Sequence, residues 1–313
     1  MVALDRLVCE WQHTSGAPSL SVAVFWRGAV LHTGCYGNSR PEAVYQTASL
    51  GKHFTAALAL LLAAHGDGPT LDAPVARHLP ELPKVWGGIT LRHLFSHTAG
   101  IPAAGYDSLD FACDYTDSQI ACAIASGGVL DFPPGTAWSY SNAGYVLAGI
   151  AIGRSAGAFY GDLLRERIFT PLGMTTATIN SPSTPVGYVR ENGQLAPASF
   201  VSPTLNRLAD GGLCLSLLDF VRWEAALSGD WGAHVGEMFI ETKLKTGERS
   251  GYGLGWFLSL SERGWVAEHD GSWQGFSTAM VRHLDEGFSA VVLADLDGFD
   301  AANLGAKLVA TAR

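Results

Sequence analysis

A serine and a lysine lie three residues apart in the apolar stretch YQTASLGKHFTAALALLLAAHG, residues 45–66. On a helix that begins near Ser49, positions i and i+3 share one face, so the Lys52 amine would reach the Ser49 hydroxyl. A serine hydroxyl is a weak nucleophile that needs a base, and a lysine can act as that base when burial lowers its pKa from ~10.4. A cation in a first helical turn also opposes the helix dipole, which often marks a functional site. The pair predicts an activated nucleophile; the simpler alternative is an N-cap serine beside a solvated lysine.

A second candidate lies in the stretch FPPGTAWSYSNAGYVLAGI, where a Tyr-Ser-Asn tripeptide precedes an apolar helix. A neighbouring cation favours a phenolate, so Tyr140 could share a proton with Lys52 and act as the general base. Asn142 could donate to a substrate carbonyl or hold the lysine. The alternative is a tightly packed tyrosine and a helix-capping asparagine.

The stretch EHDGSWQGF closes a strand-like run with His269 and Gly271. Glycine permits close backbone approach, so the N–H of Ser272 could join that of Ser49 as a pair of donors to a developing oxyanion. Trp273 follows directly, and we expect it to line the pocket for the acyl group. A histidine at this place also occurs simply as a strand-end residue.

The composition restricts the classes of partner. The chain has 313 residues, a formal charge of -9 and only 16% charged residues, so neither nucleic acid nor an anionic membrane surface is a favoured partner. The apolar run 54–64 is well short of the ~18 residues of a membrane span. Asp5 and Glu10 interrupt the region where a signal peptide would be apolar, and five cysteines without a Cys-x-x-Cys pair suit reduced, mostly buried thiols. We therefore expect a cytoplasmic protein.

Strand-like runs occur at both ends of the chain. Residues 20–37 predict a hairpin that turns at Arg27-Gly28, and residues 301–312 predict a final helix. Helical segments and loops fill the middle. We predict an α/β (α+β) fold in which an antiparallel sheet from residues 1–48 and 246–313, flanked by the terminal helices, receives a mainly helical region at 49–245, with a cleft between the two. The C-terminal strand-like runs are 252–260, 264–269, 276–284 and 288–295.

Taken together and in this order, the three motifs resemble those of the serine β-lactamase and penicillin-recognising enzyme superfamily, in particular the class C β-lactamases and their esterase relatives. The motifs are Ser49-Leu50-Gly51-Lys52, Tyr140-Ser141-Asn142 and His269-Asp270-Gly271. The third stands where the lactamases carry Lys-Thr-Gly. Similar flanking segments lie at 91–102, 168–174, 209–223 and 251–256, so the resemblance covers nearly the whole chain.

The resemblance implies a hydrolase that forms an acyl-enzyme on Ser49 without a metal or cofactor. Lys52 and Tyr140 would be the activating pair, Asn142 an orienting group, and the N–H groups of Ser49 and Ser272 the oxyanion hole. Coupled groups titrate as a pair, so the sequence leaves open which of the two takes the serine proton. Tyr-Ser-Asn replaces the Ser-Asp-Asn of class A enzymes, which puts their Glu-and-water route in doubt here.

The histidine in the third motif bears on the substrate. A fixed lysine there would stabilise a substrate carboxylate through charge-assisted contacts, whereas His269 is mostly neutral and sits beside an aspartate. Relatives with histidine at this position are often esterases or peptidases. We therefore expect a small ester, or less readily an amide, as substrate. The alternatives are a β-lactamase, a D-amino acid peptidase or amidase, or a catalytically inactive binding or scaffold protein of the same fold.

Two competing motifs suggest other chemistry. GRSAG, residues 153–157, fits the nucleophile elbow of α/β-hydrolases around Ser155, but the chain does not alternate strands and helices as that fold requires. The resemblance instead implies a helix that ends at a Ser-Gly turn. His93 and His97 could face one zinc ion, yet no glutamate lies between them and no third ligand is evident. We expect the segment from His97 to be a structural turn.

Overall fold

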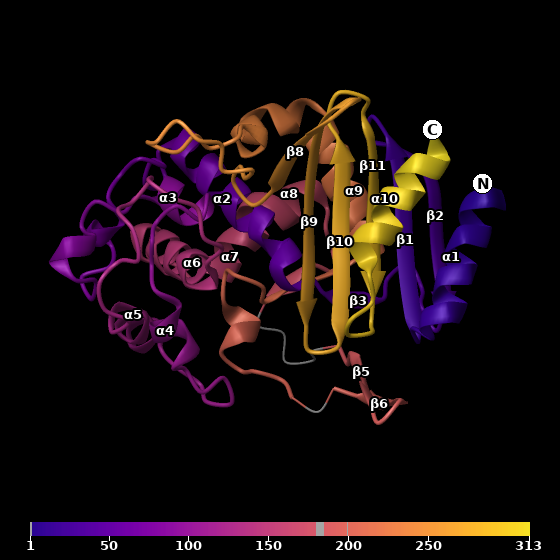
Figure 1. The fold of residues 1–313 in the computed structure, drawn as a ribbon, viewed down its shortest axis with the longest axis horizontal. Coiled ribbons are helices and arrows are strands. Elements are labelled where there is room, and N and C mark those ends of the chain that lie inside the picture. The colour runs from indigo at the N-terminus through magenta and orange to yellow at the C-terminus, as the bar shows by residue number, and fades with distance from the viewer. Residues whose placement is uncertain (1, 180–184, 199) are drawn as a thin grey trace.

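A six-stranded antiparallel sheet joins the two ends of the chain (Figure 1). The computed structural model describes residues 2–179, 185–198 and 200–313. Strand β1 from the N-terminal end pairs with β11 from the C-terminal end, which places Val22 opposite Val292. The predicted antiparallel sheet from both chain ends is confirmed. Its order is β2 (Ala29–Gly37), β1 (Ser19–Trp26), β11 (Phe288–Ala294), β10 (Phe276–His283), β9 (Gly264–Trp273) and β8 (Phe257–Ser261).

The sheet is buried on both faces, which explains why its central strands are almost continuously apolar. Side chains that alternate along β1 enter two different cores. Leu20 and Val22 pack with the terminal helices α1 (Val2–Ser15) and α10 (Ala301–Ala312), whereas Phe25 packs into the core shared with the helical region. The terminal helices therefore cover one face and the inserted region covers the other.

In the six-stranded sheet, two hairpins turn through left-handed residue pairs. Arg27 and Gly28 have φ of 49° and 78°, and Gln274 and Gly275 have φ of 48° and 84°. Positive φ at both central residues defines the type I′ turn, whose twist matches that of the flanking strands. The first turn lies where the sequence predicts it.

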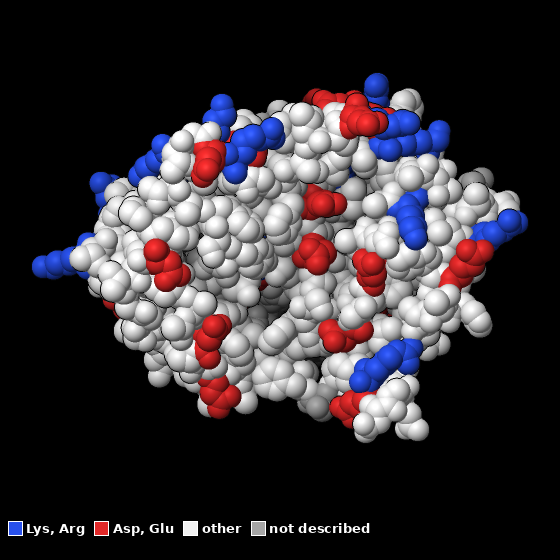
Figure 2. All heavy atoms as spheres, in the orientation of Figure 1, with Lys and Arg blue, Asp and Glu red and all other residues white. Residues whose placement is uncertain are grey.

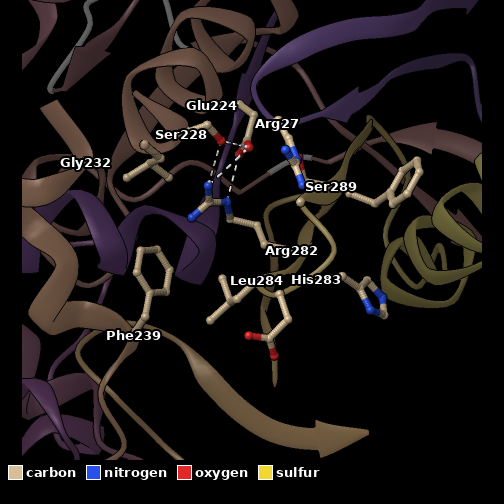
Figure 3. A pocket seen from close by; sticks show the side chains of 13 residues that line it. Arg27, Glu224, Ser228, Gly232, Phe239, Arg282, His283, Leu284 and Ser289 are labelled. Carbon is tan, nitrogen blue, oxygen red and sulfur yellow. Dashed lines mark hydrogen bonds and ion pairs between the residues drawn. The ribbon is translucent and has the colours of Figure 1, made fainter. Parts of the chain in front are cut away.

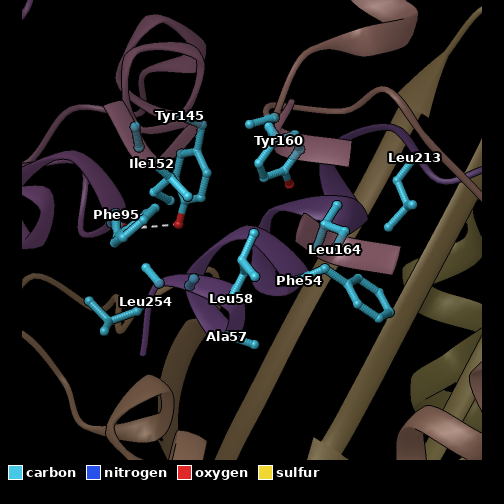
Figure 4. Packing of buried hydrophobic residues seen from close by; sticks show 14 of the residues in the cluster. Phe54, Ala57, Leu58, Phe95, Tyr145, Ile152, Tyr160, Leu164, Leu213 and Leu254 are labelled. Carbon is cyan, nitrogen blue, oxygen red and sulfur yellow. Dashed lines mark hydrogen bonds between the residues drawn. The ribbon is translucent and has the colours of Figure 1, made fainter. Parts of the chain in front are cut away.

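The helical region is organised around α2 (Lys52–His65), which is buried along every residue from Lys52 to Leu62. A helix that is apolar on all sides is stable only inside a core. Figure 4 shows Phe54 and Leu58 of this helix in one cluster of buried side chains with Leu164, Tyr145 and Ile152. The other helices are α3 (Leu91–Phe95), α4 (Ala103–Asp107), α5 (Asp117–Ala125), α6 (Asn142–Ala156), α7 (Tyr160–Leu164), α8 (Thr170–Leu172) and α9 (Leu217–Ser228).

Short strands outside the large sheet pair the segment before the nucleophile with the helical region. A small sheet contains β3 (Val44–Gln46), β7 (Leu213–Ser216) and β4 (Thr178–Ile179), and β3 ends shortly before Ser49 along the chain. A separate hairpin contains β5 (Tyr188–Glu191) and β6 (Gln194–Pro197). Helix α9 contacts β1 and β11, and one apolar core contains side chains from both the sheet and the helices. The two regions predicted to meet at residues 48 and 246 therefore differ in their type of secondary structure but share one core.

Some sequence expectations differ from the structure. The run 252–260 forms a strand only from Phe257 onward, because Tyr252 makes a single bridge and the residues between them turn. All five cysteines are free as expected, but Cys9, Cys113 and Cys122 are exposed and only Cys214 is buried. In the described part of the chain, every helix is too short or too polar for a membrane crossing.

Candidate active site

Ser49 lies in a short 3₁₀ turn, η1 (Ala48–Gly51), that leads directly into α2. The backbone before it is strained, since Ala48 has φ of 48°, a conformation that residues with a Cβ seldom adopt. Neighbouring backbone holds this turn in place. Thr47 donates from its N–H and from its hydroxyl to the carbonyl of Leu213, at 2.8 Å each. Such over-determined strain is characteristic of residues that present a functional group.

Lys52 is the first residue of α2 and is completely buried. Its Nζ lies 2.8 Å from Ser49 Oγ, 2.9 Å from Asn142 Oδ1 and 2.7 Å from the carbonyl oxygen of Asp210. Burial lowers the pKa of Lys52 to about 8, although the negative charges of Asp210 and Asp270 oppose this shift. The solvated-lysine alternative is therefore excluded by the structure.

The three contacts of Lys52 suit a neutral amine as well as an ammonium. An ammonium would donate to all three oxygens. A neutral amine has two hydrogens and one lone pair, so Asn142 and the Asp210 carbonyl could accept the two hydrogens while the lone pair faces the Ser49 hydroxyl. This geometry allows Lys52 to take the serine proton without rearrangement.

Tyr140 lies over the same amine, with its ring centroid 5.1 Å from Lys52 Nζ. The turn at His97 holds the loop that carries it. Ser141 donates its N–H to His97 Nδ1 at 3.0 Å, Ser139 donates its N–H to the His97 carbonyl at 2.9 Å, and the two rings of His97 and Tyr140 are 4.3 Å apart. His97 is thus a structural residue, as expected from the sequence.

The protonation state of Tyr140 differs from the expectation. Although the side chain is 37% exposed, desolvation raises the pKa of the phenol above its ordinary value, and the interaction with Ser49, which lowers it, is smaller. The phenolate that the neighbouring lysine was expected to favour is therefore disfavoured. The raised pKa favours the neutral phenol, which can donate a proton.

Asn142 begins α6 but does not cap it. Ser141 is the N-cap residue and accepts the N–H of Gly144 at 3.1 Å. The Asn142 side chain is consequently available to Lys52, to which its Oδ1 is bound, and it also lines the pocket beside Ser49. Of the two roles that the sequence suggested, the structure shows the contact with lysine.

Gly271 brings β9 into contact with the nucleophile turn. A Cβ at this position would lie 2.3 Å from the Thr47 carbonyl oxygen and 2.9 Å from the Ser49 nitrogen, so only glycine fits. The adjacent residue of β10 reinforces this contact, because Thr278 donates its hydroxyl to the same Thr47 carbonyl at 2.8 Å.

The strand register indicates where the Ser272 N–H points. Trp273 and Phe276 flank a two-residue turn and form its hydrogen-bonded closing pair, so Ser272 and Ser277 form the next, non-hydrogen-bonded pair. The N–H of Ser272 therefore points out of the β10 ladder. On its other side, β8 pairs with β9 only as far as Glu268. This arrangement is compatible with an oxyanion hole shared with Ser49.

His269 is placed differently from the expected substrate contact. It is 3% exposed, its Nδ1 lies 2.7 Å from the Asp270 carbonyl oxygen, and its Nε2 lies 2.9 Å from the Tyr252 hydroxyl. Both nitrogens are engaged, and the side chain does not line the pocket. Burial lowers its pKa to about 3, so the ring is neutral. The His269 side chain makes structural contacts within the protein. At this position of the third motif, where the lactamases have a lysine, the chain therefore has a neutral side chain.

The pocket beside Ser49 has a volume of about 120 Å³. Trp273 lines it as expected, and Phe111 packs edge-on against Trp273 with ring centroids 6.4 Å apart. Figure 2 shows the hollow between the helical region and the sheet, with acidic side chains near its rim. The polar side chains of the lining come from Ser49, Tyr106, Asn142, Asp210 and Ser272.

Sequence reasoning missed Asp210 and Tyr106. The Tyr106 hydroxyl donates to Asp210 Oδ2 at 2.8 Å, and both side chains are buried. Burial raises the pKa of Asp210, while the charge of Lys52 opposes that shift. The signal in the sequence was a lone acidic residue in the apolar, glycine-rich segment Ala-Asp-Gly-Gly.

The competing motifs do not form sites. Ser155 lies inside α6, and its hydroxyl donates to the Ile152 carbonyl at 2.8 Å; the helix ends at Gly157, which has φ of 63°. The nucleophile-elbow interpretation is therefore wrong. His93 accepts the Thr90 N–H at 3.2 Å as part of a helix cap. Among the described residues, no group of three or more potential ligands gathers around one point.

A larger pocket, of about 560 Å³, lies away from these motifs between α9 and the end of β10 (Figure 3). Its charged centre is the ion pair of Arg282 and Glu224, whose Nε and Oε2 are 2.9 Å apart, with Ser228 bound to both. None of the three motifs lines it. Size alone therefore does not identify the site of chemistry.

Comparisons with known proteins identify related sequences. A family model described as Beta-lactamase matches residues 4–312. The chain is 31% identical over 283 residues to penicillin-binding protein 4* of Bacillus subtilis (strain 168), which covers 82% of this chain and 61% of that protein. It is 26% identical over 304 residues to a D-aminopeptidase of Gluconobacter oxydans (strain 621H), covering 88% of this chain and 55% of the relative. The chain thus spans only part of the length of these relatives.

Solved structures share the architecture. A D-stereospecific amidohydrolase from Streptomyces sp. matches with a TM-score of 0.75 and 26% identity over 93% of each chain. The octameric penicillin-binding protein homologue from Pyrococcus abyssi matches with a TM-score of 0.82 and 23% identity, over 99% of this chain and 76% of that one, which is a likeness of fold. Because the matching family model spans nearly all of its residues, the chain belongs to the β-lactamase family.

Proposed function

We propose that this chain hydrolyses small amides, with amides or short peptides of D-amino acids as the first candidates, through an acyl-enzyme on Ser49. The observation that carries the proposal is the contact of a buried Lys52 amine with Ser49 Oγ at 2.8 Å, with partners for its other two positions. A scaffold protein would have no need for a buried lysine with a lowered pKa beside a serine that follows a strained residue.

The proposed mechanism follows from the protonation states. Neutral Lys52 takes the proton as Ser49 Oγ attacks the carbonyl carbon, and the N–H groups of Ser49 and Ser272 stabilise the oxyanion. When the carbon–nitrogen bond breaks, the proton passes from Lys52 to the leaving amine, with the phenol of Tyr140 as relay. Water then attacks the acyl-enzyme, Lys52 again accepts the proton, and the return of that proton to Ser49 releases the acid.

The choice between amide and ester depends on the relatives. The histidine of the third motif led us to expect an ester first, whereas the similar proteins named above include a D-aminopeptidase and a D-stereospecific amidohydrolase. Those names support the amide. Ester cleavage remains the second candidate, because the same acyl-enzyme forms from an ester and the described pocket lining contains no lysine or arginine that would demand a carboxylate.

One panel tests the proposal. Wild-type protein and Ser49→Ala are assayed against D- and L-amino acid amides, short-chain p-nitrophenyl esters and a penicillin. We expect turnover of a D-amino acid amide that Ser49→Ala abolishes. Hydrolysis of esters alone would favour the second candidate. Activity that survives Ser49→Ala would contradict the acyl-enzyme.

The cytoplasmic location also stays a proposal. It rests on the free state of all five cysteines. Fractionation of the native host with an antibody to the protein tests it, and recovery outside the cytoplasm would contradict it.

A further inference from the structure

Gln274 occupies a backbone position that a glutamine seldom takes. It has φ of 48° at the first central residue of the turn between β9 and β10, where a type I′ turn favours asparagine or glycine. The β5–β6 hairpin of the same chain has the favoured pair, Asn192-Gly193, with φ of 53° and 80°. A residue that its backbone disfavours persists when surrounding contacts hold it there, often at a functional site. The Gln274 side chain therefore has a role that the turn itself does not require.

The amide of Gln274 is fully used in hydrogen bonds. Its Nε2 donates to Gln46 Oε1 at 2.8 Å and to Asn206 Oδ1 at 2.9 Å, and its Oε1 accepts the N–H of Ser202 at 2.7 Å. Gln46 Nε2 donates to the same Asn206 oxygen at 2.6 Å, so the side chains of Gln46, Asn206 and Gln274 form a closed amide ring. Gln46 and Asn206 are buried. Buried hydrogen-bond networks of this kind rigidify the segments that they join.

The amide ring joins three segments around the nucleophile. Gln46 ends β3, three residues before Ser49, and Gln274 follows Ser272 by two residues. The third amide belongs to a short 3₁₀ turn, η5 (Leu205–Arg207), whose first residue lines the pocket beside Ser49. The N–H groups assigned to the oxyanion hole thus lie on two segments that the ring holds together.

A second connection between the same segments makes their orientation definite. Thr278 of β10 already donates its hydroxyl to the Thr47 carbonyl at 2.8 Å. A single hydrogen bond allows rotation about that contact, whereas the additional tie at Gln46 restricts it. Two oxyanion donors must both come within about 2.7–3.1 Å of one oxygen atom, so a small rotation of the β9 end would separate them from it.

We propose that Gln274 is a positioning residue of the oxyanion hole, which holds the Ser272 N–H at the place relative to the Ser49 N–H that one oxyanion requires. Gln274 does not itself line the pocket. The oxyanion exists only in the transition state and the intermediate, so loss of the tie should lower the rate of the chemical step more than substrate binding. The inference rests on the proposed function and deepens it by naming what sets the geometry of its oxyanion hole.

Two variants of Gln274 separate the amide ring from the turn. Gln274→Met keeps the length of the side chain without its hydrogen bonds, and Gln274→Asn keeps an amide that suits the turn but is one methylene shorter. At a temperature where circular dichroism shows each variant to be folded, both should slow labelling of Ser49 by a neutral fluorophosphonate roughly ten- to a hundredfold. Gln194→Met, at an exposed position, is the matched control and should react at the wild-type rate. A wild-type rate in Gln274→Asn would show that the turn alone accounts for this residue and would overturn the inference.

Two further readouts distinguish positioning from a general loss of structure. In Gln274→Met, kcat should fall with little change in KM. Asn206→Ala breaks the same ring, so the double variant should react no more slowly with the fluorophosphonate than the slower single variant. Multiplied losses, or a loss confined to KM, would overturn the inference.

The labelling experiment also separates this inference from the proposed function. Normal labelling of Gln274→Met would overturn the positioning role alone and leave the acyl-enzyme on Ser49 intact. A wild-type protein that does not react would overturn both.

Discussion

Replacing Lys52 by methionine tests the base assignment in most depth. Methionine keeps an unbranched side chain of similar reach in a fully buried position but has no group that can accept a proton. General base catalysis is typically worth ~10²–10⁴ in rate, which corresponds to about 3–5 kcal/mol of activation free energy. We expect kcat/KM to fall by that factor.

The pH dependence gives the sharper result. A base must be deprotonated to act, and the pKa of Lys52 is lowered by burial to about 8, so wild-type kcat/KM should rise about tenfold per pH unit below that value and level off above it. The assay is hydrolysis of the best substrate from pH 6 to 9.5. In Lys52→Met the break near pH 8 should vanish, whereas Lys84→Ala, at an exposed position, should retain it.

Stability offers an independent check on the same pKa. The folded-state pKa of Lys52, about 8, lies below the ordinary value of 10.5, so between these values the unfolded chain binds more protons and the wild type gains stability as pH rises. Lys52→Met should lack this gain between pH 8 and 9.5 in denaturant titrations. An unchanged kinetic break in the variant, or identical stability curves for the two proteins, would refute the assignment of a lowered pKa to this amine.

Three further changes test other parts of the site and the fold. Tyr140→Phe should slow amide hydrolysis by ~10² or more and p-nitrophenyl ester hydrolysis much less, because nitrophenolate leaves without a proton; equal losses on both substrates would contradict the relay. Gly271→Ala should slow fluorophosphonate labelling of Ser49 by ~10², since its Cβ would lie 2.3 Å from the Thr47 carbonyl oxygen and displace the turn; a normal labelling rate would show that this contact is dispensable. Glu224→Ala should lower the free energy of unfolding by about 3–5 kcal/mol, because Arg282 is then buried without its partner; a loss below about 1 kcal/mol would contradict this.

Much of the fold could be predicted because its signals are local. The turn at Arg27-Gly28 and the runs that become β10 and β11 combine apolar content with turn residues, and the final helix occupies the predicted residues 301–312. The sequence could not show that Tyr252 leaves the strand, since its burial against His97 and His269 is a tertiary contact.

The site was predictable to the extent that its residues follow one another in short motifs. Ser49, Lys52 and Asn142 are in contact as the motif order implied, and Tyr140 lies over the lysine. The raised pKa of Tyr140 was not predicted, because the desolvation that causes it depends on the whole fold.

The pairing of Asp210 with Tyr106 could not be predicted from sequence, because the two residues are 104 positions apart and neither belongs to a motif. The engagement of His269 with Tyr252 was missed for a similar reason. Both interactions join residues that are separated along the chain, so both depend on the tertiary fold.

The most direct test of the account is to locate the covalent adduct formed with a fluorophosphonate. After digestion, mass spectrometry of the labelled protein should place the entire modification on the peptide that contains Ser49, and Ser49→Ala should remain unlabelled. Modification of the peptide that contains Ser155, or of no serine at all under conditions where a control hydrolase reacts, would contradict the nucleophile on which the mechanism depends.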